Sequence, residues 1–485
     1  MPSSRKMKRP PESSIPSRIE LHEDRLFPAD QSTRQIAREL YASVVSLPII
    51  SPHGHTDPAW FADDEPFRDP TELLVVPDHY LFRMLYSQGV RLDELGIGVA
   101  RDDRSEAESQ RIWCLFASHY HLFRGTPSRL WLDFVFNKVF DLEVSLCSDT
   151  ADLYYERISD CLKSDDFRPR ALFERFNIEV LATTESPLDP LKSHDIIMES
   201  DWGGRIITAY RPDPVVDPEF EGFKENLGEL ARISGEDTAT WNGYLLALAQ
   251  RRSYFQKRGA TSTDHGHPTA LTADLSAREC QALLDKALKQ KISAAEAEEF
   301  RAQMLTEMAK MSIDDGLVMQ LHPGSFRNHN RSVFDTFGRD KGADIPTRTE
   351  YVRSLRPLLN KFGNRADFTL ILFTLDESVY SRELAPLAGH YPCLKLGPAW
   401  WFHDSPEGMR RFRELTTETA GFYNTVGFND DTRAFMSIPA RHDVARRMDA
   451  AYLARLVVEH RIRESEAFEL IGQLTYDLVK SAYKL

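Results

Sequence analysis

Two histidines that follow a short apolar run are the residues of this sequence best suited to metal chemistry. The run starts at Leu47 and ends in His53, Gly54 and His55. Residues two apart in a strand point to the same face, so the two histidines would share one face at the strand's carboxyl end. Two imidazoles placed in this way can bind one metal ion. The alternative is a pair of loop histidines without a common role, and this stretch alone does not separate the two.

A metal site on one strand needs further strands to bring its other ligands, and seven more short apolar runs follow. Helical segments separate most of them, which indicates an α/β fold and, with eight strands, a (β/α)8 barrel. The alternation of strands and helices is also compatible with a doubly wound open sheet, which is the alternative fold. The seven later strands are predicted at Ile178–Thr184, Arg205–Arg211, Gly259–Asp264, Gly316–His322, Phe368–Thr374, Cys393–Gly397 and Thr425–Asn429.

Helical insertions interrupt the alternation of strands and helices. The segments 73–89, 105–123 and 129–140 have helical spacing and many aromatic residues. We therefore expect a helical insertion at about 58–175, directly after the first strand, and further inserted helices at about 215–310. The basic segment 1–18 is rich in Pro and Ser and is expected to be a disordered tail, which leaves 19–485 as a single barrel domain.

Composition excludes several classes of partner. The formal charge of −14 disfavours binding to nucleic acid or to anionic membranes. The five cysteines are scattered without a C-x-x-C motif, which is typical of reduced thiols in the cytoplasm. No apolar stretch approaches the roughly 20 residues that cross a bilayer. We expect a cytoplasmic homo-oligomer that acts on a small molecule.

In a barrel of this kind chemistry lies at the carboxyl ends of the strands, and nearly every predicted end carries a polar group. Chance would not often place histidines, aspartates and arginines together on one rim, so this pattern favours a functional role for the two opening histidines. The groups at these ends are Glu185, Arg211, Asp264, His322 with Arg327 nearby, Thr374 with Asp376, Trp400, and Asp431 with Arg433.

These groups suggest a metal site beside an anion site. Asp431 could complete a two-histidine, one-carboxylate site, because the last strand of a closed barrel lies next to the first. His322 could be a further ligand or a proton carrier, although a lone histidine is as often structural. Arg211, Arg327 and Arg433 could bind a substrate carboxylate, whereas each by itself is better read as a rim salt bridge.

Two aromatic positions could contact a substrate. Trp400 opens the cluster Trp400-Trp-Phe402, which could form a stacking floor for a sugar ring, although such clusters more often anchor a core or a loop. Tyr80 lies in the helical insertion, which could fold over the barrel mouth as a lid. The alternative for Tyr80 is a buried tyrosine with a hydrogen-bonded hydroxyl.

Taken together, the ordered motifs resemble the uronate isomerase (glucuronate isomerase) family of the amidohydrolase superfamily. The matching motifs run along nearly the whole chain, and only residues 1 to about 18 precede the part that resembles the family. Thr183-Thr-Glu-Ser-Pro187 departs from the family's usual Thr-Thr-Asp-Asp-Pro, and a family arginine after strand six has only Arg382 as its nearest match. The other matching motifs are Pro52-His-Gly-His55, Asp78-His-Tyr80, Tyr210-Arg-Pro-Asp213, Asp264-His265, Gln320-Leu-His-Pro-Gly-Ser-Phe-Arg-Asn328, Trp400-Trp-Phe402, Asp431-Thr-Arg433 and Ala440-Arg-His442.

The resemblance implies a distorted (β/α)8 TIM-type barrel of the metal-dependent hydrolase kind, with a helical region after strand one. It implies interconversion of D-glucuronate with D-fructuronate, and of D-galacturonate with D-tagaturonate, in hexuronate catabolism. It also implies one divalent metal, expected to be Zn²⁺, held by His53, His55 and Asp431, with His55 also near the substrate. Catalytic and substrate positions carry over to Tyr80, Arg211, Asp264, His322 and Arg433.

The residues of strands four and six favour an isomerase over a hydrolase. Many hydrolases of this superfamily bind two metals through a lysine on strand four and a histidine on strand six. This sequence has Asp264 and Thr374 at those ends, so a two-metal centre lacks its bridge. A mononuclear-metal hydrolase is the first alternative. A catalytically silent sugar-acid-binding protein is the second, and the intact set of rim residues argues against it.

An aldose–ketose conversion moves one hydrogen between C2 and C1, either as a proton through an enediol or as a metal-assisted hydride shift. We expect proton transfer, with Asp431 or Asp264 as the base at carbon. Tyr80 and His322 would move the oxygen-bound protons, and Arg433 would stabilise the anionic intermediate.

Overall fold

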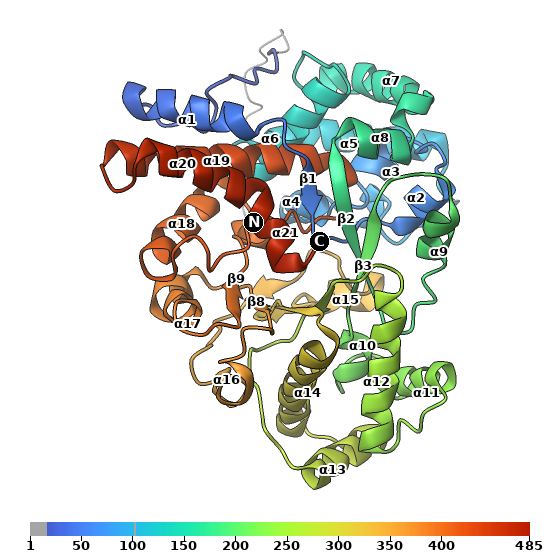
Figure 1. Cartoon of the computed structure of the whole chain (residues 1–485). Helices are drawn as coiled ribbons and strands as arrows, with labels where there is room; N and C mark the ends of the chain where they lie inside the picture. The colour runs from blue at the N-terminus through green and yellow to red at the C-terminus, as the bar shows by residue number, and fades with distance from the viewer. Residues whose placement is uncertain (1–16, 101–102) are drawn as a thin grey trace, which may run out of the picture.

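Seven parallel strands curl around one axis, and helices cover their outer side (Figure 1). The computed structural model describes residues 17–100 and 103–485. Hydrogen-bonded neighbours follow the order β1-β2-β3-β4-β5-β8-β9, so the strands pair in the order in which the chain reaches them. The strands are β1 (Ile49–Ser51), β2 (Ile178–Glu185), β3 (Ile206–Tyr210), β4 (Ser262–His265), β5 (Val318–Leu321), β8 (Leu370–Leu372) and β9 (Leu394–Leu396).

The eighth predicted strand is not a regular strand in the structure. Thr425 forms one parallel bridge with Leu396, at the end of β9. Gly427 then adopts a φ of 76°, a left-handed conformation that interrupts a strand. The barrel still closes, since the amide of His55 donates to the carbonyl of Thr432 at 2.9 Å. The prediction of a distorted (β/α)8 barrel is confirmed, and the prediction of a regular strand at Thr425–Asn429 is corrected to a single bridge.

Apolar side chains fill much of the barrel interior, and the C-terminal helix closes the end at which the strands begin. The last helix, α21 (Leu478–Tyr483), contributes Val479 and Tyr483 to the buried cluster inside the sheet. Lys484 donates to the carbonyl of Gly316, which precedes β5, so the chain end lies at the amino-terminal side of the strands. The strands supply Ile50, Val180, Ala182, Ile207, Val318 and Ile371 to the same cluster.

The segment between β1 and β2 is built from helices that share a core of their own. Trp113, Phe116 and Tyr154 are fully buried in it. Residues 1–16 of the predicted tail lie outside the described residues, and Arg18 pairs with Val144 in an antiparallel bridge. The helices of this segment are α2 (Pro58–Asp63), α3 (Pro70–Leu74), α4 (His79–Ser87), α5 (Glu106–His119), α6 (Pro127–Phe134), α7 (Ala151–Leu162) and α8 (Pro169–Arg175).

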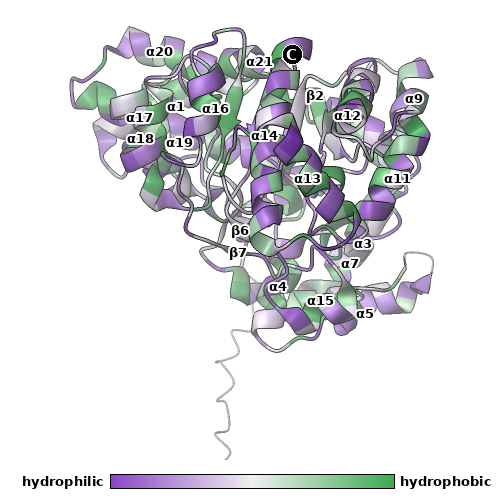
Figure 2. Cartoon of the chain, turned by 90° about the horizontal axis from the view of Figure 1, so that it is seen from below, coloured by the Kyte–Doolittle hydropathy of each residue, from purple (hydrophilic) through white to green (hydrophobic). Residues whose placement is uncertain are grey.

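The remaining helices surround the sheet and carry both hydrophilic and hydrophobic residues (Figure 2). The chain between 276 and 315 forms two helices, and a capping box from Ser293 to Glu296 starts the second. These helices are α1 (Gln31–Val44), α9 (Lys192–Glu199), α10 (Asp213–Val216), α11 (Phe223–Ser234), α12 (Trp241–Gln256), α13 (Ala277–Leu288), α14 (Ala294–Asp315), α15 (Arg331–Phe337), α16 (Arg356–Phe362), α17 (Ala385–Ala388), α18 (Pro406–Ala420), α19 (Ile438–Val458) and α20 (Glu464–Gly472).

A small hairpin absent from the sequence prediction follows β5. Strands β6 (Ser325–Phe326) and β7 (Ile345–Pro346) pair antiparallel and carry the loop with α15 between them. Strands of two residues are too short for a recognisable hydrophobic pattern. In the described ranges no helix combines the length and apolarity that a membrane span requires.

Candidate active site

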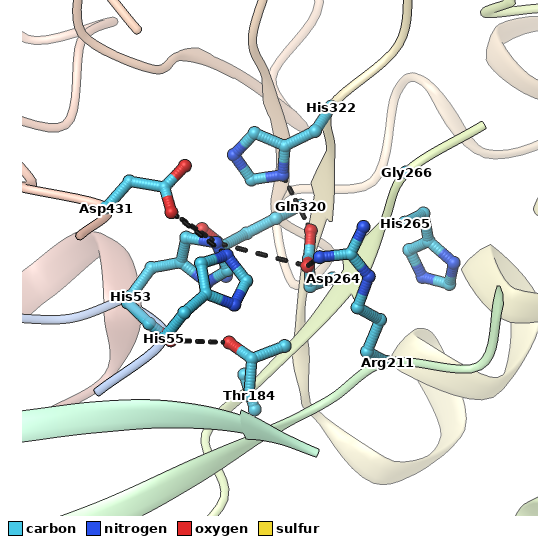
Figure 3. A network of polar contacts seen from close by, with 12 residues as sticks. His53, His55, Thr184, Arg211, Asp264, His265, Gly266, Gln320, His322 and Asp431 are labelled. Carbon is cyan, nitrogen blue, oxygen red and sulfur yellow. Dashed lines mark hydrogen bonds and ion pairs between the residues drawn. The ribbon is translucent and has the colours of Figure 1, made fainter. Parts of the chain in front are cut away.

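The two opening histidines and Asp431 meet at the carboxyl end of the barrel (Figure 3). Oδ1 of Asp431 lies 3.5 Å from Nε2 of His53 and 3.1 Å from Nε2 of His55. The other oxygen, Oδ2, accepts a hydrogen bond from the indole of Trp400 at 2.5 Å. Asp431 itself has a φ of 38°, which is rare for a residue other than glycine and typical of functional sites.

The backbone of strand one is held close to its neighbours at the histidine pair. The hydroxyl of Thr184, near the end of β2, donates to the carbonyl of Gly54 at 2.8 Å. A Cβ on Gly54 would lie 3.4 Å from the carbonyl oxygens of Ala182 and Thr432. β2 and the segment after Thr425 therefore lie against the backbone of Gly54 from both sides.

A second group of charged residues lies beside the first. Nδ1 of His322 is 2.7 Å from Oδ1 of Asp264, and Nη1 of Arg211 is 3.1 Å from the other oxygen of that carboxylate. Arg211 also donates from Nε to Asp213 at 2.9 Å. The ring of His322 stacks on Phe373 and on His53, with centroid distances of 3.9 and 4.9 Å. These contacts turn Nε2 of His322 away from Asp264.

Burial and nearby charges set the protonation of this cluster. Burial lowers the pKa of His53 to about 4, so its imidazole is neutral at pH 7, the form that binds a metal. Burial acts to raise the pKa of Asp431, but His53 and His55 outweigh it and hold the value well below the usual range. Burial also acts to raise the pKa of Asp264, and Arg211 and His322 lower it well below the usual range.

The donor set fits a metal ion. His53, His322 and Asp431 each offer a ligand atom, and these atoms all lie within 4.8 Å of one another. Ligands of a tetrahedral zinc ion lie about 3.3–3.5 Å apart, close to the separations between Asp431 and the two histidines of strand one. Nε2 of His322 is buried without a hydrogen-bond partner in the described part of the chain, as expected of an atom that faces a ligand.

A cavity of about 650 Å³ opens above these residues. This volume lies within the range of about 300–1,000 Å³ that is usual for small-molecule sites. Arg211, Arg327 and Arg433 all line it, so the structure brings the three predicted arginines to one cavity. Arg327 pairs with Asp344 at 2.9 Å and Arg433 with Asp340 at 3.2 Å.

Tyr80 reaches this cavity from the helical insertion, near the start of α4. The carboxylate of Asp78 caps the helix by accepting from the amide of Tyr80 at 2.8 Å. The ring of Trp131 packs edge-on against that of Tyr80 at 5.8 Å, and the guanidinium of Arg441 lies 3.6 Å from the Trp131 centroid. Tyr80 is thus held on several sides.

Four residues that line the cavity, and Arg382 outside it, were either missed by the sequence-based prediction or make contacts that it did not predict. Trp400 was expected to face substrate, and its indole N–H is bonded to Asp431. Asp213 could have been assigned from the Arg-Pro-Asp motif that follows β3. Asp340 and Asp344 lie on the loop between β6 and β7, where no sequence pattern marked them. Arg382 pairs with the adjacent Glu383 and does not line the cavity.

A curled parallel barrel with two histidines and an aspartate at its carboxyl end defines an enzyme of the amidohydrolase-like class. Its chemistry is set by the residues around that cluster, because the barrel itself supports many activities.

Comparison with known proteins narrows the class to one family. The model of the glucuronate isomerase family matches residues 28–483. The uronate isomerase of Phenylobacterium zucineum is 65% identical over 467 residues, which are 96% of this chain and 97% of the relative. The chain therefore belongs to the glucuronate isomerase family, and the predicted uronate isomerase activity and fold class are confirmed.

Solved structures agree with this assignment. The crystal structure of glucuronate isomerase from Caulobacter crescentus matches with a TM-score of 0.95 at 62% identity, over 96% of this chain and 98% of that chain. The crystal structure of uronate isomerase from Thermotoga maritima matches with a TM-score of 0.89 at 27% identity, over 96% and 99% of the two chains.

Proposed function

We propose that the protein interconverts D-glucuronate with D-fructuronate, and D-galacturonate with D-tagaturonate, with one bound divalent metal ion, Zn²⁺. One observation carries this proposal. The candidate metal ligands around Asp431 and the three arginines line the same cavity, so one small molecule can meet both groups. A uronate has a carbonyl group at one end and a carboxylate at the other, which matches this arrangement.

Of the three arginines, Arg211 and Arg327 bind the substrate carboxylate and set the register of the sugar, whereas Arg433 serves the charge at the reacting carbons. Each is now paired with a carboxylate of the protein: Arg211 with Asp264 and Asp213, and Arg327 and Arg433 with the aspartates of the loop after β6. Arg327 and Arg433 are partly exposed, so they can accept a ligand. Anchoring the C6 carboxylate holds C1 and C2 at a fixed place over the catalytic groups.

The metal is held by His53, His55 and Asp431, with His322 close enough to be a further ligand. When bound, the ion supplies Lewis-acid polarisation of substrate oxygens. Donor chemistry supports zinc, which prefers imidazole nitrogen and carboxylate oxygen at such sites. Both strand-one histidines approach Asp431 through Nε2, which supports a shared position for them around one ion.

Proton transfer uses the groups that surround the reacting carbons. His322 is bonded to Asp264 through Nδ1, so its Nε2 can give or take an oxygen-bound proton. Tyr80, which lines the same cavity, also carries protons, and Arg433 stabilises the enediolate charge. The base at carbon is Asp431 or Asp264, because both carboxylates lie at the reacting end of the cavity: Asp264 faces His322 and Arg211, and Asp431 faces the strand-one histidines and Trp400.

A coupled assay with both uronates, on protein of measured metal content, tests the function. We expect turnover of at least one uronate that falls on chelation and returns when zinc is restored. The same reaction in D2O tests the chemistry, since proton transfer introduces solvent deuterium into the product. A product without deuterium, under conditions where the shared proton exchanges, would show a hydride shift.

A mononuclear-metal hydrolase is the alternative outcome of this assay. Release of product from lactones, amides or phosphotriesters without uronate turnover would identify it. The residues around the cavity speak against a two-metal hydrolase, because Thr374 takes the place of the strand-six histidine, and the described residues contain one group suited to a metal.

We further propose that the protein is a cytoplasmic homo-oligomer. The five cysteines are free thiols, which suits a reducing compartment. Light scattering on the purified protein measures the number of subunits, and fractionation of the source cells measures location.

A further inference from the structure

A layer of polar side chains lies inside the barrel beneath the proposed site. Ser262 precedes Asp264 by two residues in β4, and Gln320 precedes His322 by two residues in β5. Residues two apart in a strand point to the same face, so Ser262 lies one step below Asp264, and Gln320 lies one step below His322, which directly follows β5. Asn429 precedes Asp431 by two residues in the irregular segment after Thr425, and its contact with Tyr483 places it in the same layer. Relative exposure is 1% for Ser262, 0% for Gln320 and 4% for Asn429, so the layer is sealed from solvent.

The hydroxyl of Tyr483 connects this layer. It donates to Oε1 of Gln320 at 3.0 Å and accepts from Nδ2 of Asn429 at 3.2 Å. The amide of Gln320 extends the network, since Nε2 donates to the hydroxyl of Ser262 at 3.3 Å. One phenol, two residues before the last residue of the chain, thus joins the three barrel segments that carry Asp264, His322 and Asp431.

The end of the chain is fitted closely to the barrel floor. A Cβ on Gly427 would lie 2.5 Å from the carbonyl oxygen of Leu474 and from Cγ2 of Val479, so only glycine permits this approach. Tyr483 and Val479 are 0% and 1% exposed. A purely structural plug would need only apolar contacts, whereas a buried phenol demands hydrogen-bond partners and fixes their orientation.

We propose that Tyr483 is a positioning residue of the active site, which acts through Gln320 and Asn429 to fix the strand ends that hold His322, Asp264 and Asp431. Outer partners of metal ligands commonly tune affinity and activity in this way. This inference rests on the proposed metal site. It adds that the C-terminal segment helps to position the active-site residues.

The test compares Tyr483→Phe with Tyr476→Phe in the zinc-loaded enzyme. Tyr476 lies in the same C-terminal region, but its hydroxyl donates to Glu179 at 2.5 Å, away from the layer. We expect kcat and zinc affinity of Tyr483→Phe to fall about tenfold, the lower end of the 10–100-fold loss for partners bonded directly to metal ligands, because Tyr483 acts through Gln320 and Asn429. KM should change little, because Tyr483 does not touch the cavity. The visible spectrum of the Co²⁺-loaded variant should shift, and Tyr476→Phe should match the wild type in all four measurements.

Gln320→Met provides a second variant if Tyr483→Phe does not fold. It removes the acceptor of the Tyr483 hydroxyl and should reproduce the losses in kcat and metal affinity, and the double variant should lose no more than either single one. Wild-type kcat, zinc affinity and Co²⁺ spectrum in both single variants would overturn the positioning role. Wild-type protein without metal-dependent uronate turnover would instead overturn the proposed function.

Discussion

Asp431 is the residue at which most of the site's contacts meet. It faces His53 and His55 through one oxygen and Trp400 through the other, and its φ of 38° is maintained by these surroundings. A residue other than glycine adopts such a conformation when neighbouring structure enforces it. The geometry of the site is therefore built into the folded barrel.

Replacement of His53 by Asn should weaken metal binding and uronate isomerisation together. The side chain is 1% exposed and lies in the group of candidate ligands, so its loss removes a donor without opening the surface. We expect losses beyond the 10–100-fold typical of outer partners. Metal titration, kcat and circular dichroism measure the effect, with His119→Asn on α5 as the control. Full metal affinity in His53→Asn would contradict the site.

Replacement of Asp264 by Asn should lower kcat by about 10²–10⁴-fold, the usual contribution of general acid–base catalysis. The carboxylate orients His322 and faces Arg211, and an amide can neither balance the arginine nor accept at both positions. Steady-state kinetics with glucuronate measure the loss. Asp335→Asn, at an exposed ion pair on α15, is the matched control. Unchanged kcat in Asp264→Asn would exclude the proposed proton path through His322.

At the scale of elements, helix α4 of the helical insertion brings Tyr80 to the mouth of the barrel. Its start is set by Asp78, whose carboxylate accepts from the amide of Tyr80. Side chains that cap helices in this way stabilise the first turn. The placement of Tyr80 therefore depends on a local signal as well as on packing against Trp131.

Asp78→Ala should lower both stability and kcat, whereas Asp78→Asn should retain most of each. Loss of a cap costs about 1 kcal/mol, and asparagine caps helices as well as aspartate does. Denaturant unfolding and steady-state kinetics separate the two variants. If alanine reduced stability but left kcat at the level of the asparagine variant, the cap would not govern the position of Tyr80.

At the scale of the whole molecule, a buried carboxyl makes stability depend on pH. Burial raises the pKa of Glu185, at the end of β2, to about 7, against the lowering effect of hydrogen bonds from Thr208 and Thr183. The folded state then binds this proton more tightly than the unfolded chain. The free energy of unfolding should fall as pH rises from about 4.5 to 7, by about 3 kcal/mol from this group.

Glu185→Gln should flatten the pH dependence of stability in that interval. Glutamine keeps the shape of the side chain and does not ionise. Denaturant unfolding of both proteins between pH 4.5 and 7 measures the difference, with the exposed Glu199→Gln on α9 as the control. A slope equal to that of the wild type would mean that Glu185 ionises normally in the fold.

Helix and strand alternation specified the barrel: seven of the eight predicted strands form, and all of them except the polar β4 are apolar runs between helical segments. The eighth was lost to Gly427, whose left-handed conformation is required by the approach of the C-terminal segment. The two-residue strands β6 and β7 were missed, since hairpins of this length depend on the loop between them and leave no periodic pattern.

The sequence by itself determined which residues stand at the strand ends, because the strand period and chain order fix them. It therefore predicted that His53, His55 and Asp431 would meet, along with Asp264, His322 and the arginines. Only the tertiary structure decided how these groups pair, through the bond from Trp400 to Asp431, the contact of Asp264 with His322, and the phenol of Tyr483 beneath them. Such pairings join residues far apart in the chain, and their directions follow from side-chain packing rather than from spacing.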